Sequence, residues 1–402
     1  MSQMQQIIDR ASKVLIPNYA RQNIVMARGE GSLLWDADGK RYIDLFAGFG
    51  GSILGHCHPA LIDAITQQAH TLWQVGNTYH TQPQVDVAER LNRFAFPGKA
   101  FFCHSGLEAN EAACKLARLR YKDSSPRRYK IISLQHSFHG RSLAMLAATG
   151  NPKVKVGFDP LPAGFVQVDF GDFDKLAAAV DAETAGIIIE PIQGEGGINM
   201  HPAEYPQRVR DLCNQKGLTL IFDEVWTGCG RTGKWFAHQY FARSGGGLIT
   251  PDIMTLGKAV GGGVPVGVLF ARPELSDLMV PGTHGCTLGG NPMCMAVSRS
   301  VLDVIERENL LHHVNALSDY AVSRISREPR IAEKIVGVRG RGLMLGIELK
   351  NPPEQFLPKA LAMGLVVNLT AQKVIRLAPP VNIPQQLWQQ GLDVLVDLIA
   401  ML

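Results

Sequence analysis

Short apolar runs alternate with amphipathic stretches through the middle of the chain. Six runs are continuously apolar rather than alternating, which predicts strands buried on both faces; they cover residues 100–103, 129–134, 186–190, 218–222, 252–256 and 266–271. Helical periodicity covers 107–121 and 206–217, and Gly217 is a typical helix end. This alternation predicts an α/β fold with a mainly parallel sheet covered by helices.

The two ends of the chain follow a different pattern. Residues 31–45 predict a hairpin whose turn is "DADGK". From about residue 292 the helices lengthen, and the segments 336–349 and 365–380 predict a small mixed α/β lobe. The glycine runs at 245–247 and 261–263 are typical of loops inside the large domain.

Composition excludes several classes of protein. The net charge of +4 over 402 residues, without a dense Lys/Arg block, disfavours nucleic-acid binding. The seven cysteines form no C-x-x-C pair, which disfavours a disulfide framework and a thiolate zinc site. Adjacent side chains in "GHCHP" (55–59) diverge, so we expect no metal there. Without an export signal or an apolar run of ~18 residues, we expect a cytoplasmic protein that does not enter the membrane.

The stretch "LTLIFDEVWTGCGRTGKW" (218–235) permits three interpretations. A dinucleotide fingerprint is disfavoured, because five residues separate the strand from Gly228 and no acid follows about 20 residues on. A phosphate loop needs Ser or Thr where this chain has Trp235. A glycine-rich loop after a core strand remains, and a nucleotide-binding hydrolase is kept as an alternative from another class.

Lys258 and Asp223 indicate a different cofactor. Lys258 follows an apolar strand and precedes three glycines, so we expect its amine in a partly dry pocket where its pKa falls, as a Schiff-base lysine requires. Asp223 ends a predicted strand and can keep a pyridine nitrogen protonated. Ser105 and Gly106 begin a predicted helix, whose free N–H groups favour a phosphate. Together these residues predict pyridoxal 5′-phosphate.

Eight motifs in register give the chain a family resemblance over about residues 22–380. It resembles the class III, fold-type I aminotransferases, most nearly the acetylornithine/ornithine group; the motifs are "GEGSLLWDADGKRYIDL", "GHCHP", "SGLEANEAACKLAR", "SFHGR", "EPIQGEGG", "IFDEVWTGCGRTG", "LGKAVGGGVPVG" and "THGCTLGGNP". The resemblance implies a large domain with a mainly parallel seven-stranded sheet (61–285). It also implies a small α/β domain built from the N- and C-terminal segments (1–60 and 286–402).

The resemblance also implies roles around the cofactor. Lys258 and Asp223 would be catalytic: the lysine would bind the cofactor and move a proton, while Asp223 would pair with the ring nitrogen. Phe138 and Val225 would contact the two faces of the cofactor ring. The phosphate would be bound by Ser105, Gly106 and Leu107. His139 and Trp226 would also contact the cofactor. Thr287 would reach the phosphate from the partner subunit, which implies a homodimer with its active site at the subunit interface.

For the substrate, the resemblance makes Arg141 the carboxylate-binding arginine, since a planar guanidinium suits a carboxylate. Arg376 would hold the second carboxylate of 2-oxoglutarate, and Glu195 would neutralise it when an amino donor lacks that group. Two positions depart from the family. Trp226 occupies the position where relatives usually have glutamine. Phe49 lies near the sequence position at which ornithine aminotransferases have a tyrosine.

The predicted activity is ping-pong transfer of an ω-amino group from an acetylornithine-like donor to 2-oxoglutarate, giving an aldehyde and glutamate. Ornithine, 4-aminobutyrate and other ω-amino acids are alternative donors, and Phe49 weakens the case for ornithine because it has no hydroxyl. An aminomutase or racemase on the same fold and a non-catalytic protein remain further alternatives.

Overall fold

A seven-stranded sheet forms the centre of the large domain in the structure, a computed structural model that describes residues 3–402. Six strands are parallel, and β12 alone runs opposite to its neighbours β11 and β4. In spatial order the strands are β4 (Lys99–Cys103), β12 (Gly267–Ala271), β11 (Ile253–Leu256), β10 (Thr219–Asp223), β7 (Thr184–Ile189), β5 (Lys130–Leu134) and β6 (Phe165–Val168). The mainly parallel sheet is therefore confirmed.

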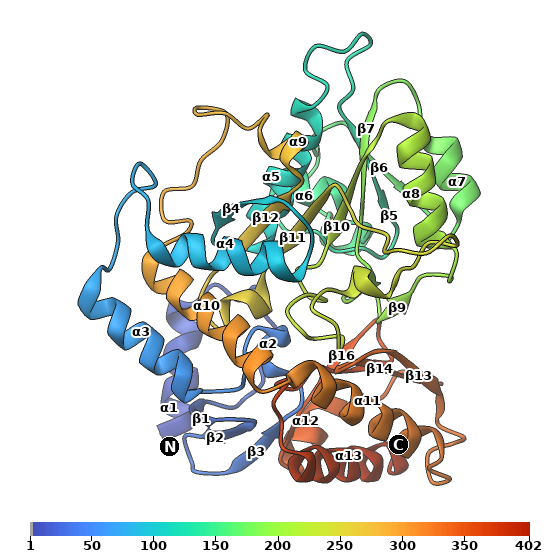
Figure 1. The fold of residues 1–402 in the computed structure, drawn as a ribbon. Coiled ribbons are helices and arrows are strands. Elements are labelled where there is room, and N and C mark those ends of the chain that lie inside the picture. The colour runs from blue at the N-terminus through green and yellow to red at the C-terminus, as the bar shows by residue number, and fades with distance from the viewer. Residues whose placement is uncertain (1–2) are drawn as a thin grey trace.

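Helices cover both faces of this sheet (Figure 1). Ile131, Ile221 and Leu269 point to one face, where they pack with α5 (Gly106–Leu119) and α6 (Leu143–Ala148). The alternate residues of the strands point to the other face. That face is covered by α4 (Gln82–Phe94), α7 (Phe173–Ala179), α8 (Tyr205–Lys216) and α10 (Pro292–Arg307). Burial on both faces explains the uninterrupted apolar runs of these strands.

The two ends of the chain share one sheet, which agrees with the predicted small α/β domain built from both terminal segments. Strand β15 near the C-terminus pairs in parallel with β3 near the N-terminus, and Figure 1 shows both ends of the chain on the same side of the large domain. This sheet contains β1 (Met26–Glu30), β2 (Leu33–Asp36), β3 (Arg41–Asp44) and β15 (Leu365–Val366). A second sheet contains β13 (Ile335–Arg341), β14 (Met344–Leu349), β17 (Val374–Leu377) and β16 (Asn368–Thr370).

Further helices complete the fold. Helix α10 packs against α3 and α4 of the large domain, so it bridges the two parts of the chain. The remaining helices of four or more residues are α1 (Gln3–Val14), α2 (Ala47–Gly50), α3 (Pro59–Thr71), α9 (Pro273–Ser276), α11 (Leu310–Ser326), α12 (Phe356–Ala362), α13 (Gln385–Ala400) and the 3₁₀ turns η2 (Ala237–Tyr240) and η3 (Lys258–Gly261). Within residues 3–402, every helix is too short or too polar to cross a lipid bilayer. The domain boundaries proposed from the sequence stay a prediction.

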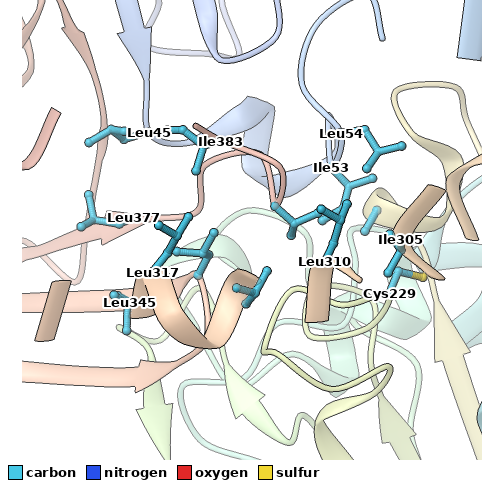
Figure 2. Close-up of a cluster of buried hydrophobic side chains, with 14 of the residues drawn as sticks. Leu45, Ile53, Leu54, Cys229, Ile305, Leu310, Leu317, Leu345, Leu377 and Ile383 are labelled. Carbon is cyan, nitrogen blue, oxygen red and sulfur yellow. The ribbon is translucent and has the colours of Figure 1, made fainter. Parts of the chain in front are cut away.

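One apolar core joins segments that are far apart in sequence (Figure 2). Leu45, Ile53 and Leu54 of the N-terminal segment lie in one cluster with residues of α10, α11, β14 and β17. Cys229, from the glycine-rich loop that follows β10, is part of the same cluster. The loop is therefore part of the joint between the large and small domains.

The glycines of this loop leave no room for a nucleotide phosphate. An added Cβ at Gly228 would lie 2.9 Å from Leu256 Cδ2, at Gly230 3.2 Å from Leu311 Cδ2, and at Gly233 2.7 Å from Asn315 Cγ. Neighbouring side chains therefore fill the space that a phosphate loop keeps open for its ligand. The structure contradicts a nucleotide-binding hydrolase built on residues 218–235.

Arg231 holds this loop against the small domain. The side chain is fully buried, and Nη1 donates to the carbonyl of Leu343 at 3.1 Å and to that of Pro379. The backbone N–H of Leu343 donates in return to the Arg231 carbonyl at 3.0 Å. Burial lowers the pKa of Arg231, and the negative charge of Asp44 acts in the opposite direction.

Arg231→Ala is expected to destabilise the fold by about 2–4 kcal/mol, because it opens a cavity and leaves two buried carbonyls without their donor. Arg231→Met should recover part of that loss by filling the space. The control is Arg243→Ala, an exposed arginine in a nearby loop, with an expected change within about 0.5 kcal/mol. Urea midpoints measure the effect, and equal midpoints for Arg231→Ala and Arg243→Ala would contradict it.

Candidate active site

The carboxyl ends of the parallel strands meet at one edge of the large sheet, where ligands of open α/β sheets bind. Asp223 is the last residue of β10, Glu190 follows β7, and Lys258 lies two residues after β11. A cavity of about 500 Å³ opens at this edge. Its walls include Ser105, Gly106, Leu107, Phe138, His139, Arg141, Glu190, Glu195, Asp223, Val225, Trp226 and Lys258. The fold thus brings most of the predicted site residues to one cavity.

Asp223 is buried and held by three donors. His139 Nδ1 lies 2.8 Å and Asn110 Nδ2 lies 2.7 Å from Asp223 Oδ2, while the backbone N–H of Val225 donates to Oδ1 at 3.1 Å. Thr255 Oγ1, on the neighbouring strand, fixes Asn110 by donating to its Oδ1 at 2.6 Å. Since a carboxylate only accepts, His139 carries its proton on Nδ1. This network fixes the orientation of a carboxylate that faces the cavity.

Asn110 was missed in the sequence. A signal was present, because it is an amide on the face of α5 that is otherwise lined by Ala109, Ala113 and Ala117. A buried amide requires partners, and that requirement alone indicates a second polar group opposite it. The sequence did not show that this group is Asp223, 113 residues away.

Lys258 is held in a backbone conformation that few lysines adopt. Its φ is +44°, and it opens the 3₁₀ turn η3 between Gly257 and Gly262. Nζ lies 4.8 Å from the centre of the Trp226 ring. Burial lowers the pKa of Lys258, while Glu195, Asp223 and Glu190 act in the opposite direction. Strained backbone of this kind concentrates at functional sites, which supports a role for the amine.

The start of α5 forms a cup at one end of the cavity. Its first N–H groups have no acceptor inside the helix, and Gly106 and Leu107 both line the cavity. An added Cβ at Gly106 would lie 2.5 Å from Val225 Cγ1, and one at Gly257 would lie 3.0 Å from Gly106 N. Only glycine therefore keeps the cup open. Ser105 caps the helix, with Oγ accepting from Glu108 N at 3.2 Å.

Arg141 and Phe138 lie together at another wall. The Arg141 guanidinium carbon is 5.7 Å from the centre of the Phe138 ring, and the arginine side chain is exposed. The backbone N–H of Phe138 donates to Glu190 Oε2 at 3.1 Å. Burial raises the pKa of Glu190, and the charge of Asp223 adds to the rise, whereas His139 lowers it. Glu190 therefore stands beside the site as a carboxyl that takes up a proton more readily than usual.

Arg376 and Glu195 form an ion pair at the opposite side. Arg376 Nη1 is 3.0 Å from Glu195 Oε1, and its Nε and Nη2 donate to Asn368 Oδ1 at 2.8 and 2.6 Å. Glu195 lines the cavity, whereas Arg376 is only 2% exposed and does not. Glu195 thus stands between Arg376 and the cavity. A ligand carboxylate can reach the guanidinium only when Glu195 moves aside.

Aromatic rings surround the Arg376 guanidinium. Its central carbon lies 4.7 Å from the centre of the Trp226 ring, 5.3 Å from Phe46 and 5.8 Å from Phe49. Cations are favoured at the faces of such rings. Phe49 has a positive φ of +59° and a 48% exposed side chain, and its neighbours Gly48 and Gly51 line the cavity.

Trp226 fills a space between Gly50 and Gly194 that a smaller side chain would leave empty. An added Cβ at Gly50 would lie 2.5 Å from Trp226 Nε1, and one at Gly194 would overlap the six-membered ring. Nε1 is buried and has no hydrogen-bond partner within residues 3–402. The indole N–H is therefore a donor without an acceptor beside the cavity.

Thr287 is a predicted site residue that, like Phe49 and Arg376, does not line the cavity. Its side chain is exposed, and the residue does not line the cavity of its own chain. Its carbonyl accepts a bond from Gln74 Nε2 at 3.4 Å. The predicted contact with a partner's phosphate stays a prediction.

Comparison with known proteins agrees with this geometry. The family model for aminotransferase class-III matches residues 16–399. The chain is a class-III aminotransferase. An acetylornithine aminotransferase from Myxococcus xanthus is 41% identical over 93% of this aminotransferase and 92% of its own length. One from Nitrosomonas europaea is 42% identical over 90% of this chain and 92% of its own.

Solved structures support the fold of this aminotransferase. An ornithine aminotransferase from Toxoplasma gondii, described with partial occupancy of PLP at its active site, superposes with a TM-score of 0.92 at 29% identity. The match covers 99% of this chain and 94% of that one. An acetylornithine aminotransferase from Elizabethkingia anophelis gives a TM-score of 0.86 at 28% identity, with both chains fully covered. Fold-type I architecture is confirmed.

The cofactor of this family is pyridoxal 5′-phosphate, and the residues present fit it. A half-buried primary amine, a buried carboxylate and a helix start kept open by glycines all face one cavity. These supply the amine, the ring-nitrogen partner and the phosphate cup that the cofactor needs. The cofactor predicted from the sequence is therefore confirmed at the level of the family.

Proposed function

We propose that this aminotransferase moves an ω-amino group from an acylated diamino acid of the acetylornithine type to 2-oxoglutarate, in two half-reactions on one site. The observation that carries the proposal is the Arg376–Glu195 pair at 3.0 Å, beside a cavity that also holds Arg141. Arg141 can bind a carboxylate at all times, whereas Arg376 can do so only when Glu195 moves away. Such a site suits two substrates of which only one carries a second carboxylate. The acetylornithine aminotransferases at 41–42% identity support this donor class.

Pyridoxal phosphate, when bound, supplies an aldehyde that reacts with amines and a ring that stabilises negative charge on the reacting carbon. The chain supplies the rest. Lys258 Nζ binds the cofactor and then carries the proton from the carbon that bears the amino group. Desolvation, which lowers the pKa of Lys258, makes its neutral form available for that transfer. Asp223 pairs with the ring nitrogen, and its three donors keep it in place.

Other residues bind and orient. The N–H groups at Gly106 and Leu107, with the Ser105 hydroxyl, would hold the phosphate at the start of α5. Phe138 and Val225, which line the cavity, would contact the ring, and His139 holds Asp223 in place. Arg141 binds the carboxylate remote from the reacting carbon, which the ω-amino donor and 2-oxoglutarate share. Trp226, which lacks the glutamine amide found in relatives, narrows the cavity instead.

The switch at Glu195 distinguishes the two substrates. With Glu195 on Arg376, the guanidinium is neutralised, which suits an ω-amino donor because its reacting carbon carries no carboxylate. With Glu195 displaced, Arg376 binds the carboxylate next to the reacting carbon of 2-oxoglutarate, the group that the donor lacks. Phe49 has no hydroxyl to bind a free α-amino group, which favours an acylated donor over ornithine.

Glu195→Gln is expected to slow the donor half-reaction about tenfold, which corresponds to ~1.4 kcal/mol for a partly exposed pair. The 2-oxoglutarate half-reaction should stay within a few-fold, since Arg376 is then free to bind the carboxylate next to the reacting carbon. Arg376→Ala should impair the 2-oxoglutarate half-reaction more than the donor half-reaction, and should raise the KM for 2-oxoglutarate. Stopped-flow measurement of each half-reaction checks this, with exposed Glu204→Gln as control. Equal losses in both half-reactions of Glu195→Gln would contradict the switch.

Product balance tests the proposed reaction. Incubation with N²-acetylornithine and 2-oxoglutarate should give one glutamate for each acylated amino aldehyde formed. Without a 2-oxo acid, turnover should stop after one equivalent of donor per active site. Continued isomerisation of the donor in the absence of 2-oxoglutarate would instead support an aminomutase.

We also propose a homodimer that completes the site, in a cytoplasmic enzyme whose seven thiols are unpaired. Large apolar side chains near Thr287 and the segment it contacts are exposed in the single chain, among them Trp73 (62%), Tyr79 (66%) and Leu288 (50%). Such side chains are typical of interfaces. The proposed dimer would bury them and bring Thr287 to the partner's phosphate cup.

Light scattering should give a mass near twice 43.8 kDa. Thr287→Ala should remain dimeric but release pyridoxal phosphate roughly tenfold more readily, as expected for one lost hydrogen bond to a charged group. Thr283→Ala, in the same loop, is the matched control. A monomeric active enzyme would contradict the proposal, as would equal cofactor affinity in the two variants.

A further inference from the structure

Three side chains with metal-binding atoms converge beside the phosphate cup. His104 precedes the Ser105 cap of α5, Glu108 lies in the first turn of that helix, and Cys286 lies in the loop between α9 and α10. Their ligand atoms all lie within 4.8 Å of one another. A histidine, a carboxylate and a thiol meeting from two distant segments form a set of donors that binds zinc in proteins.

The distances fit one small cation. His104 Nδ1 is 3.0 Å from Glu108 Oε1, and Cys286 Sγ is 3.4 Å from His104 Nδ1 and 3.9 Å from Glu108 Oε1. Tetrahedral zinc with ordinary bond lengths places nitrogen and oxygen ligands about 3.4 Å apart and sulfur about 3.6 Å from either. Side-chain shifts of about 0.4 Å therefore suffice to bind the ion.

Glu108 has one carboxylate oxygen to spare. Its Oε2 accepts from the backbone N–H of His104 and from Ser105 Oγ, both at 2.9 Å, and so completes the cap of α5. Its Oε1 instead faces His104 and Cys286. A helix cap alone would need only Glu108 and Ser105; it does not account for Cys286, which lies 178 residues further along the chain.

We propose that His104 Nδ1, Glu108 Oε1 and Cys286 Sγ bind a divalent cation of the zinc class, with water in the fourth position. The site is independent of the donor specificity proposed above. The ion ties the loop that carries Thr287 to the first turn of α5, and so fixes the position from which Thr287 would reach the partner's phosphate cup. The "GHCHP" segment offers no such convergence, since His56 bonds to Asp44 and His58 caps α3.

Metal binding to the holoenzyme tests the proposal. Chelator-stripped holoenzyme is titrated with zinc chloride against a chromophoric chelator, and should bind one ion per chain. Cys286→Ser and Glu108→Gln should each weaken binding at least about 100-fold, since each removes a direct ligand. Cys57→Ser is the matched control, because Cys57 is an exposed thiol between two histidines. Circular dichroism and cofactor content establish that each variant is folded.

Two further readouts identify the ligands. Cobalt(II) in place of zinc should give the intense visible bands of a tetrahedral thiolate site, at wavelengths longer than the cofactor bands, and Cys286→Ser should abolish them. Zinc should protect Cys286 from alkylation in peptide mapping, and leave Cys57 reactive. The proposal is overturned if zinc does not bind, or if it binds equally to the parent, Cys286→Ser and Glu108→Gln proteins.

Discussion

Lys258→Ala should reduce transamination by more than ~10⁴-fold, because it removes both the covalent anchor of the cofactor and the group that transfers the proton. The variant should still fold and bind pyridoxal phosphate, since the cup at Gly106 and the carboxylate of Asp223 are unchanged. Borohydride reduction should attach the cofactor to the peptide that contains Lys258 in the parent, and to no peptide of the variant.

Lys234→Ala is the matched control, an exposed lysine in the loop that follows β10. Its activity should equal that of the parent. A small primary amine added to Lys258→Ala should restore part of the proton transfer, and no part of the covalent attachment. Retention of parent-like turnover by Lys258→Ala would contradict the role of the lysine.

Asp223→Asn is the second large effect expected. The substitution keeps the shape of the side chain but removes the charge that pairs with the ring nitrogen. Breaking a buried pair of this kind costs about 3–5 kcal/mol, or roughly 10²- to 10⁴-fold in kcat. His139 and Asn110 would also lose the acceptor that both now share. Single-turnover kinetics with saturating donor measure the loss.

Glu190→Gln is the control for Asp223→Asn, since Glu190 is a second buried carboxyl of the same cavity. Burial raises the pKa of Glu190, so this carboxyl already takes up protons near neutral pH. Replacing it by an uncharged amide therefore changes the charge of the site less than Asp223→Asn does. We expect a loss below tenfold. Equal losses in Asp223→Asn and Glu190→Gln would show that the site needs negative charge in general, and not at Asp223.

Continuous apolar runs predicted six strands of the central sheet to within two residues at each end. The exception was β6, whose sequence "FVQV" lies at the sheet edge and is largely half-buried. Its apolar run is short and is interrupted by the polar Gln167, so its pattern is weak. The hairpin at 31–45 was predicted correctly, and β1 in front of it was not.

Local sequence predicted the candidate site where a charge interrupts an apolar run. Lys258 and Asp223 each follow a buried strand, and so stood out. Arg231 did not, because the glycines around it resemble a surface loop, and its acceptors Leu343 and Pro379 are more than a hundred residues away. The zinc-class site was equally hidden, since His104 and Cys286 lie 182 residues apart. Such contacts follow from the folded chain and not from any local pattern.

The first half-reaction tests the central claim most directly. Holoenzyme is mixed with one amino donor at a time, without 2-oxo acid, and the loss of the long-wavelength cofactor band is followed in a stopped-flow instrument. The account predicts that N²-acetylornithine converts the whole band with a kcat/KM at least tenfold above those of ornithine, 4-aminobutyrate and β-alanine, and that 2-oxoglutarate then restores it. Faster conversion by ornithine or 4-aminobutyrate, or no conversion by acetylornithine, would contradict the account.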